Sequence, residues 1–198
     1  IYDLLVASRP DIRTVIHETT VEGLDIVPAN IDLSAAEVQL VNEVAREQAL
    51  KRVLRPVLDE YDVILVDCQP SLGLLTINAL TASHGVIIPL ETEFFALRGV
   101  ALLVETVERV KDRLNATLEI DGILATMVDS RTLHSREVLE RLEQAFGEQL
   151  FDTRIRRTIK FPDASVATEP IISYAPNHAG AHAYRRLARE VIARGDAA

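Results

Sequence analysis

Hydrophobic positions follow two different spacings, which alternate along the chain. Helical spacing, with apolar residues three or four positions apart, marks residues 35–59, 95–114 and 135–146. Shorter apolar runs typical of strands lie near residues 24–29, 61–67, 85–90, 120–128 and 150–156. Because strand and helix patterns alternate, we predict an α/β fold, with a doubly wound and mostly parallel sheet flanked by helices.

Several polar residues are candidate helix-start signals. Ser34 is a candidate N-cap for segment 35–59, which we predict to be one long amphipathic helix. Ser135 is a similar candidate for segment 135–146.

His178 and His182 are four residues apart, but the sequence offers no HExxH pattern or cysteine cluster to complete a zinc site. We therefore interpret His178 as a cap-region residue rather than a metal ligand.

Composition favours a single domain over residues 1–198. At 198 residues and 48% hydrophobic, the chain can bury one substantial core. Cys68 is its one cysteine, so no intrachain disulfide can form and a reducing, cytoplasmic setting is favoured. We expect Cys68 to be a small buried hydrophobe. No apolar run reaches membrane-spanning length, so we predict no membrane association.

Charge bears on nucleic-acid binding. The formal net charge of -9 argues against a uniformly basic nucleic-acid binder, although phosphate contacts depend on local patches. Two local clusters of basic residues exist: Arg154, Arg156, Arg157 and Lys160, and then Arg185, Arg186, Arg189 and Arg194. Taken alone, each cluster is typical of a solvated surface with ordinary ion pairs.

Asp67 closes the apolar run that begins near residue 61. A turn of Pro-Ser-Leu-Gly and a new helical pattern follow it. The carboxyl ends of parallel strands open at the ligand crevice of a doubly wound sheet, where a carboxylate can face Mg²⁺ and phosphate. The alternative is an ordinary turn carboxylate at the end of a strand.

The stretch Asp67-Cys-Gln-Pro-Ser-Leu-Gly-Leu-Leu-Thr-Ile-Asn-Ala-Leu-Thr-Ala-Ser83 resembles the second nucleotide motif of the ParA/Soj partition ATPases. Further similar segments follow in the family's order: Thr20 to Ala29, Ile88 to Gly99, Ala125 to Thr132, Lys160 to Ser165, and Glu169-Pro-Ile171. The resemblance covers nearly the whole chain and implies a P-loop NTPase-like fold that uses ATP and Mg²⁺.

The family's first motif, a glycine-rich loop ending in Gly-Lys-Thr-Thr, does not occur in the sequence. None of the eight glycines is followed by Lys-Ser or Lys-Thr. We therefore expect the chain to be the C-terminal portion of a ParA-like ATPase domain, with N-terminal strands missing, ATPase-inactive and poorly folded on its own. The alternative is a non-catalytic scaffold or DNA-binding remnant.

The resemblance also implies roles for individual residues. Asp67 would help hold Mg²⁺, and the turn after it would respond to the γ-phosphate. Asp129, with the nearby backbone at Met127, would recognise the adenine of ATP. The alternative for Asp129 is an aspartate at a turn or helix entry, where its side chain bonds the local backbone. Arg131 and Lys160 would contact DNA phosphates without reading sequence.

The sequence departs from the family's common pattern at Gln69, where Cys-Pro-Pro-Ser has become Cys-Gln-Pro-Ser. Gln69 restores a backbone N–H and frees φ, so we expect a less rigid turn. The family's common Ile-Pro-Arg-Asn is likewise replaced by Ile-Arg-Arg-Thr, ending at Thr158, so we do not expect here the contacts that the family's proline and asparagine make.

The resemblance implies a reaction cycle. ATP would close a homodimer, the dimer would bind nonspecific duplex DNA in the cytoplasm as a nucleoid-associated protein, and a ParB-like centromere-binding partner would stimulate hydrolysis. A MinD-like positioning ATPase, anchored to membrane by an amphipathic tail, is a further alternative. We expect the apolar stripe Tyr184, Leu187, Ala188, Val191 and Ile192 to face the core instead, which disfavours that alternative.

Overall fold

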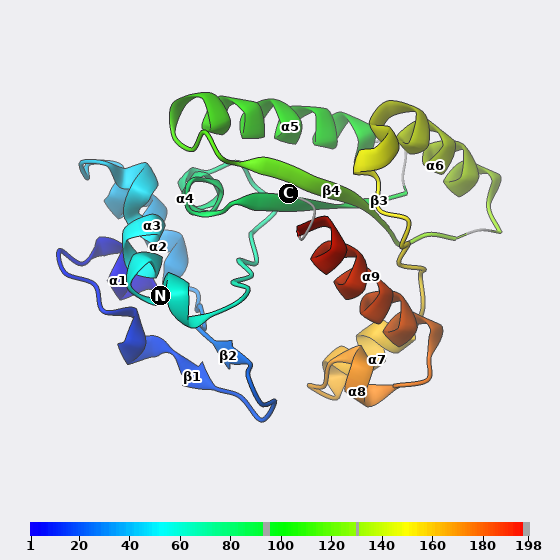
Figure 1. Cartoon of the computed structure of the whole chain (residues 1–198), viewed down its shortest axis with the longest axis horizontal. Helices are drawn as coiled ribbons and strands as arrows, with labels where there is room; N and C mark the ends of the chain where they lie inside the picture. The colour runs from blue at the N-terminus through cyan, green and yellow to red at the C-terminus, as the bar shows by residue number, and fades with distance from the viewer. Residues whose placement is uncertain (93–95, 130, 196–198) are drawn as a thin grey trace. The chain divides into compact units, whose positions relative to one another are not determined.

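The described part of the chain forms two compact units. The computed structural model describes residues 1–92, 96–129 and 131–195. One unit combines Ile1–His84 with Thr106–Leu118, and the other combines Gly85–Glu105 with Glu119–Ala198. Figure 1 shows the helices and strands of the chain with their labels. The single domain expected over residues 1–198 stays a prediction.

The first unit is built mainly from short helices around one core. Its α-helices are α1 (Tyr2–Val6), α2 (Leu33–Leu40), α3 (Ala49–Leu54) and α4 (Leu74–Ala82). Its 3-10 helices are Ile12–Val15, Arg46–Gln48 and Arg55–Glu60. The strand predicted near residues 24–29 is only β2 (Asp25–Ile26), which pairs antiparallel with β1 (His17–Glu18). The core contains Leu4, Leu5, Ile12, Ala36, Leu40, Ala49, Val53 and Val57.

The long helix predicted over residues 35–59 is broken. It divides into α2, α3 and two 3-10 helices, and α2 is preceded by Asp32 at its N-cap position rather than by Ser34. Ala45, between α2 and α3, has a left-handed φ of 54°, which a continuous right-handed helix excludes. The break turns part of the predicted apolar stripe outward, and Val44 is 89% exposed.

The apolar segment at residues 61–67 has no strand conformation, so this prediction was wrong for the chain as described. A strand requires a hydrogen-bonding neighbour, and no described segment pairs with residues 61–67. Its apolar side chains are consequently accessible, with Leu65 84% exposed. Cys68 is also exposed, contrary to its predicted burial.

The second unit is organised by two parallel strands, β3 (Gly85–Glu91) and β4 (Glu119–Thr126). Their register pairs Gly85 with Glu119 and Glu91 with Thr126, with a shift between Val86 and Ile87. The predicted strand at residues 150–156 contributes two parallel bridges, Leu150 to Ile123 and Arg156 to Val128. The helices are α5 (Ala96–Arg113), α6 (Leu133–Phe146), α7 (Lys160–Val166), α8 (Ile171–Tyr174) and α9 (Ala179–Gly195), with a 3-10 turn at Gly147–Gln149.

Helices cover both faces of this sheet (Figure 1). On one face, Ile88, Leu90, Ile123 and Ala125 form a core with apolar residues of α6 and of the N-terminal half of α5. On the other face, Leu124 packs with Phe151, Ile155 and Ala183, and Leu187 and Val191 of α9 lie against this cluster. The alternation along β4 therefore places successive side chains on opposite faces. The observed α/β arrangement, a parallel sheet flanked by helices, confirms the predicted fold class.

The predicted helices at 95–114 and 135–146 correspond to α5 and α6, although residue 95 lies outside the described residues. The predicted stripe of α9 faces the core only in part, since Tyr184 is 43% and Ile192 is 60% exposed.

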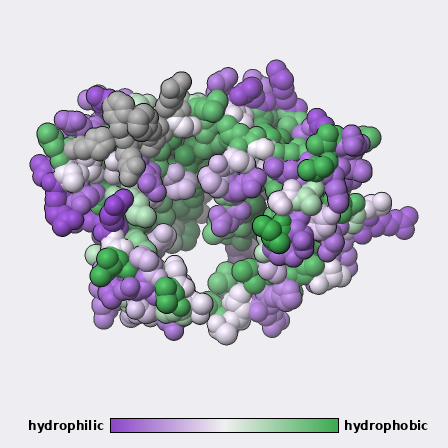
Figure 2. Space-filling model, turned by 180° about the vertical axis from the view of Figure 1, so that it is seen from behind, coloured by the Kyte–Doolittle hydropathy of each residue, from purple (hydrophilic) through white to green (hydrophobic). Residues whose placement is uncertain are grey.

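None of the described helices is long and apolar enough to cross a membrane. Figure 2 shows hydrophobic surface interspersed with hydrophilic surface on the face that it draws.

Candidate functional site

Asp67 lies in the first unit, at the start of the turn that leads into α4. The residue is exposed, and among the described residues no hydrogen bond or ion pair to its carboxylate occurs. The turn itself is ordered by local bonds: the amide of Ser71 donates to the carbonyl of Gln69 at 2.7 Å, and the hydroxyl of Thr76 donates to the carbonyl of Ser71 at 2.7 Å. An accessible carboxylate with unused oxygens suits Mg²⁺, which prefers hard oxygen ligands.

Cys68, next to Asp67, is unsuited to nucleophilic chemistry. Its sulfur lies 3.6 Å from the carbonyl of Val66. Partial desolvation and the neighbouring Asp67 carboxylate raise the pKa of the Cys68 thiol. The reactive thiolate is therefore disfavoured.

Asp129 and Arg131 form one compact ion pair in the second unit. The Asp129 Oδ1 accepts hydrogen bonds from the backbone N–H of Arg131 at 3.1 Å and from its Nε at 2.9 Å. The Asp129 Oδ2 accepts from Arg131 Nη2 at 2.8 Å. Side-chain and then backbone hydrogen bonds from Arg131 lower the pKa of Asp129 to about 2. The Asp129 carboxylate is therefore held ionised by Arg131, which is also a predicted DNA contact.

The backbone of Asp129 is supported from the start of α6. Its N–H donates to the hydroxyl of Ser135 at 3.3 Å, and its carbonyl accepts from the hydroxyl of Thr132 at 3.1 Å. The hydroxyls of Ser135 and Thr92, both buried, lie 3.0 Å apart. Thr132, rather than the predicted Ser135, is the N-cap of α6, because its hydroxyl accepts from the Ser135 N–H. Ser135 instead fixes the segment that carries Asp129.

Met127 precedes this pair with an uncommon backbone conformation. Its φ of 52° lies in the left-handed region, where residues other than glycine are infrequent. Its side chain is 40% exposed. Such strained residues gather at functional sites, so the conformation agrees with a role for the backbone near Met127 in binding a ligand.

Lys160 is the first residue of α7 and lies away from the Asp129 pair in sequence. Its Nζ donates to Asp163 at 3.0 Å, one turn further along the helix, and lies 5.9 Å from the centre of the Tyr174 ring. The hydrogen bond and charge of Asp163 raise the pKa of Lys160. No described contact joins Lys160 to Asp129 or to Arg131. The two predicted DNA residues therefore each have an acidic partner of their own.

The other basic residues divide into structural and accessible ones. Arg154 pairs with Glu143, and Arg185 donates to the carbonyls of Pro176 at 2.7 Å and Ile172 at 3.2 Å. Arg186 and Arg189 are exposed, and no partner for either occurs among the described residues.

Arg194 is also structural. It donates to the carbonyls of Asp121 at 2.8 Å and Leu150 at 3.1 Å, and its guanidinium lies 4.1 Å from the Phe151 ring centre.

His178 fulfils its predicted capping role, because its Nδ1 accepts from the N–H of Gly180 at 3.0 Å. No group of three or more potential metal ligands occurs within the described ranges.

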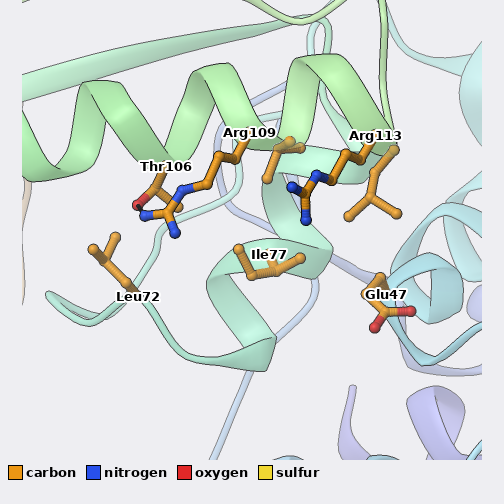
Figure 3. Close-up of a pocket in the computed structure, with 8 residues that line it drawn as sticks. Glu47, Leu72, Ile77, Thr106, Arg109 and Arg113 are labelled. Carbon is orange, nitrogen blue, oxygen red and sulfur yellow. Dashed lines mark hydrogen bonds between the residues drawn. The ribbon is translucent and has the colours of Figure 1, made fainter.

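The first unit also contains a pocket that the sequence motifs did not predict, and Figure 3 shows it. Arg109 and Arg113 project from α5 toward Ile77 of α4, with Leu72 near one end and Glu47 near the other. The pocket has a volume of about 410 Å³ and is completed by Thr106, Val110 and Leu114. Arginines four residues apart share one face of a helix, which was the available sequence signal. Because Leu72 belongs to the turn after Asp67, this pocket adjoins that turn.

Comparison with known proteins agrees with the sequence motifs. A family model described as an AAA domain matches residues 1–120. An uncharacterised Mycobacterium tuberculosis protein is 59% identical over 194 residues, and the chain spans 61% of its length. The chromosome-partitioning ATPase Soj of Treponema pallidum is 48% identical over 98% of this chain and 76% of its own length.

A solved structure is also similar in fold. The cobyrinic acid a,c-diamide synthase of Mycobacterium smegmatis, with a bound ATP analogue and magnesium, superposes with a TM-score of 0.79 and 37% identity. The match covers 93% of this chain and 68% of that protein. A related protein of this fold thus binds nucleotide and magnesium. Taken with the Soj relative and the matched domain, these similarities show that the chain belongs to the ParA/Soj-type family of partition ATPases.

Proposed function

We propose that the full-length protein is an ATP-dependent DNA partition ATPase. The observation that carries this proposal is Asp67, an accessible carboxylate without a hydrogen-bond partner among the described residues, followed by an ordered turn and α4. In this proposal Asp67 is a magnesium ligand, either directly or through a bound water. Bound Mg²⁺ would neutralise charge on the phosphates of ATP.

Asp129 and the backbone near Met127 are the proposed contacts to the adenine base. Asp129 Oδ2 receives one hydrogen bond from Arg131, and a carboxylate oxygen can accept a second. An amino group of the base could therefore bind without breaking the ion pair. The left-handed Met127 would direct its neighbouring backbone groups toward the base.

DNA binding is assigned to Arg131 and Lys160. The Arg131 side chain is 87% exposed and that of Lys160 is 41% exposed, so both can approach phosphate. In a homodimer formed on ATP binding, each contact would occur twice, which makes DNA affinity depend on nucleotide. A ParB-like centromere-binding protein would then stimulate hydrolysis and release the cytoplasmic, nucleoid-associated dimer.

The DNA assignment is tested by fluorescence anisotropy of the full-length protein with a labelled duplex of arbitrary sequence. We expect binding with ATP but not with ADP, and a steep loss of affinity as salt rises. Arg131→Ala and Lys160→Ala should weaken binding and each reduce the salt slope by about one. Arg186→Ala removes the same charge from an exposed position and is the matched control. Binding that is equal with ATP and without nucleotide would instead favour a DNA-binding scaffold.

The magnesium assignment is tested by ATP hydrolysis. Asp67→Asn removes the charge that holds Mg²⁺, so hydrolysis should fall and should need more Mg²⁺ to reach half its maximum. Asp62→Asn removes a charge from an exposed aspartate in the same segment and should change neither quantity. An Asp67→Asn protein with the hydrolysis rate and Mg²⁺ dependence of the parent would overturn the assignment.

A further inference from the structure

Glu37 of α2 contacts the turn that follows Asp67 at two points. Its Oε1 accepts a hydrogen bond from the side-chain amide of Gln69 at 3.3 Å and another from the backbone N–H of Leu75 at 3.3 Å. These two donors lie on either side of the turn. One carboxylate oxygen therefore joins the beginning of the turn to the beginning of α4.

Both elements that Glu37 connects are firmly held in the first unit. On α2, the adjacent Ala36 and the nearby Leu40 are essentially inaccessible, at 0% and 1%. On α4, the buried Asn78 donates to the carbonyl of Arg46 at 2.9 Å and accepts from the Leu50 N–H at 3.1 Å. The turn between Gln69 and Leu75 is therefore fixed between two anchored helices.

The start of α4 lacks a cap from its own sequence. Gly73 occupies the N-cap position and has no side chain to accept a hydrogen bond. The first N–H groups of a helix have no partner within the helix, and a carboxylate near them is favoured by the helix dipole. Glu37 supplies such a carboxylate from α2.

Gly73 also allows the close approach of this carboxylate. A Cβ at position 73 would lie 2.2 Å from Glu37 Oε1. The Glu37 side chain is flexible enough to move away, but it would then leave both of its hydrogen-bond donors. Alanine at this position should therefore break the same contacts without altering any charge.

We propose that Glu37 is a positioning residue that holds the turn from Gln69 to Leu75, and thereby presets Asp67 for magnesium and nucleotide. This inference rests on the proposed function of Asp67. Glu37 acts through the turn and does not itself touch the metal. Gln69, which stands where the resembled family commonly has proline, is the side chain through which the turn is held.

The first part of the test measures the contact itself, by hydrogen exchange of the Leu75 amide in the full-length protein without nucleotide. Glu37→Ala and Gly73→Ala should each accelerate this exchange by about tenfold relative to the parent. Glu37→Gln retains an acceptor oxygen and should have a smaller effect. Glu43→Ala, at an exposed glutamate just beyond α2, is the control. If Leu75 exchanges equally in Glu37→Ala and the control, the contact is absent and the proposal is wrong.

The second part measures the consequence for ligands, by titrating Mg²⁺ against a fluorescent ATP analogue. Gln69→Glu places two like charges together and should weaken apparent Mg²⁺ affinity by about tenfold. The double variant, Gln69→Glu with Glu37→Gln, again has one carboxylate and one amide at this contact. It should recover most of the lost Mg²⁺ affinity. The change should appear in the Mg²⁺ requirement, whereas a purely structural role would leave it unchanged.

The two parts separate the possible failures. Faster exchange at Leu75 with an unchanged Mg²⁺ requirement would reduce Glu37 to a helix cap and overturn the positioning role. If the parent protein binds neither Mg²⁺ nor the ATP analogue, the proposed function fails together with the positioning role. In that case, the exchange measurement would still report the contact as a structural one.

Discussion

Arg131 donates side-chain hydrogen bonds to both carboxylate oxygens of Asp129, at 2.9 and 2.8 Å. The residue predicted for the adenine site and a residue predicted for DNA thus share one ion pair. In the proposed function, a ligand bound at Asp129 would therefore also affect the contact of Arg131 with phosphate. The pair offers a direct physical link between the two proposed binding events.

The ion pair predicts an unusually acidic Asp129. In a carbon-detected NMR titration, the Asp129 carboxyl should titrate near its pKa of about 2. Because this pKa lies below the unfolded value, the pair stabilises the fold fully above about pH 4, and this contribution is lost as the pH falls through about 2. Arg131→Ala should raise the pKa toward the usual value, and Lys160→Ala should leave it unchanged. A midpoint that is the same in both variants would show that the pair does not form.

Weakening the pair should alter DNA binding in the opposite direction to loss of Arg131. Asp129→Asn removes the negative charge beside the guanidinium and leaves Arg131 more available to phosphate. Because Asp129 is also a proposed adenine contact, the measurement is made at saturating ATP. For an exposed ion pair, we then expect affinity for nonspecific duplex to rise by about two- to fivefold at low salt. Asp62→Asn changes the net charge equally. An equal rise in that control would indicate a general charge effect rather than release of Arg131.

Gly122 on β4 should not tolerate a side chain. A Cβ there would lie 2.6 Å from the Phe151 ring and 2.9 Å from the carbonyl oxygen of Gln149. Gly122→Ala should therefore lower the free energy of unfolding by about 1–3 kcal/mol in urea denaturation. Gly99→Ala is the matched comparison, because a Cβ there meets nothing within 4 Å. Because Gly99 lies within α5, Gly99→Ala should raise the free energy of unfolding by about 0.5–1 kcal/mol. Equal effects of the two substitutions would contradict the close packing around Gly122.

Arg194 should contribute to stability although it is a basic residue near the end of the described chain. Arg194→Ala removes hydrogen bonds to the Asp121 and Leu150 carbonyls and the contact with Phe151. We expect a loss of about 1–3 kcal/mol in the free energy of unfolding. Arg186→Ala, on the same helix, should stay within about 0.5 kcal/mol of the parent. Thermal unfolding followed by circular dichroism compares the two, and similar melting temperatures would count against the assigned contacts.

Local patterns in the sequence were sufficient where each element packs on one side. The stripes of α5 and α6 predicted both helices, and apolar residues of α6 and of the N-terminal half of α5 pack against a sheet. The segment at 35–59 carried a similar stripe, but a left-handed Ala45 interrupts it, and no apolar pattern encodes that conformation. The run at 61–67 has strand-like residues, yet a strand forms only when another segment supplies its hydrogen bonds.

The candidate site was predictable residue by residue but not as a set of contacts. Asp129 and Arg131 are two positions apart, yet only the backbone turn shows that they bind each other. Glu37 contacts Leu75, 38 residues away along the chain, and nothing in the spacing of the sequence indicates it. Long-range contacts of this kind depend on how α2 and α4 pack, which a linear pattern does not contain.

The backbone conformation at Met127 also limits which residues can replace methionine at this position. Its left-handed conformation is readily adopted by glycine and asparagine, whereas a branched β-carbon crowds it. During divergence, position 127 should therefore accept Gly or Asn more readily than Val or Ile, although valine and isoleucine suit the strand that ends just before it. The backbone conformation at position 127 would then decide which residues are accepted there. The hydrophobicity of a residue alone would predict this poorly.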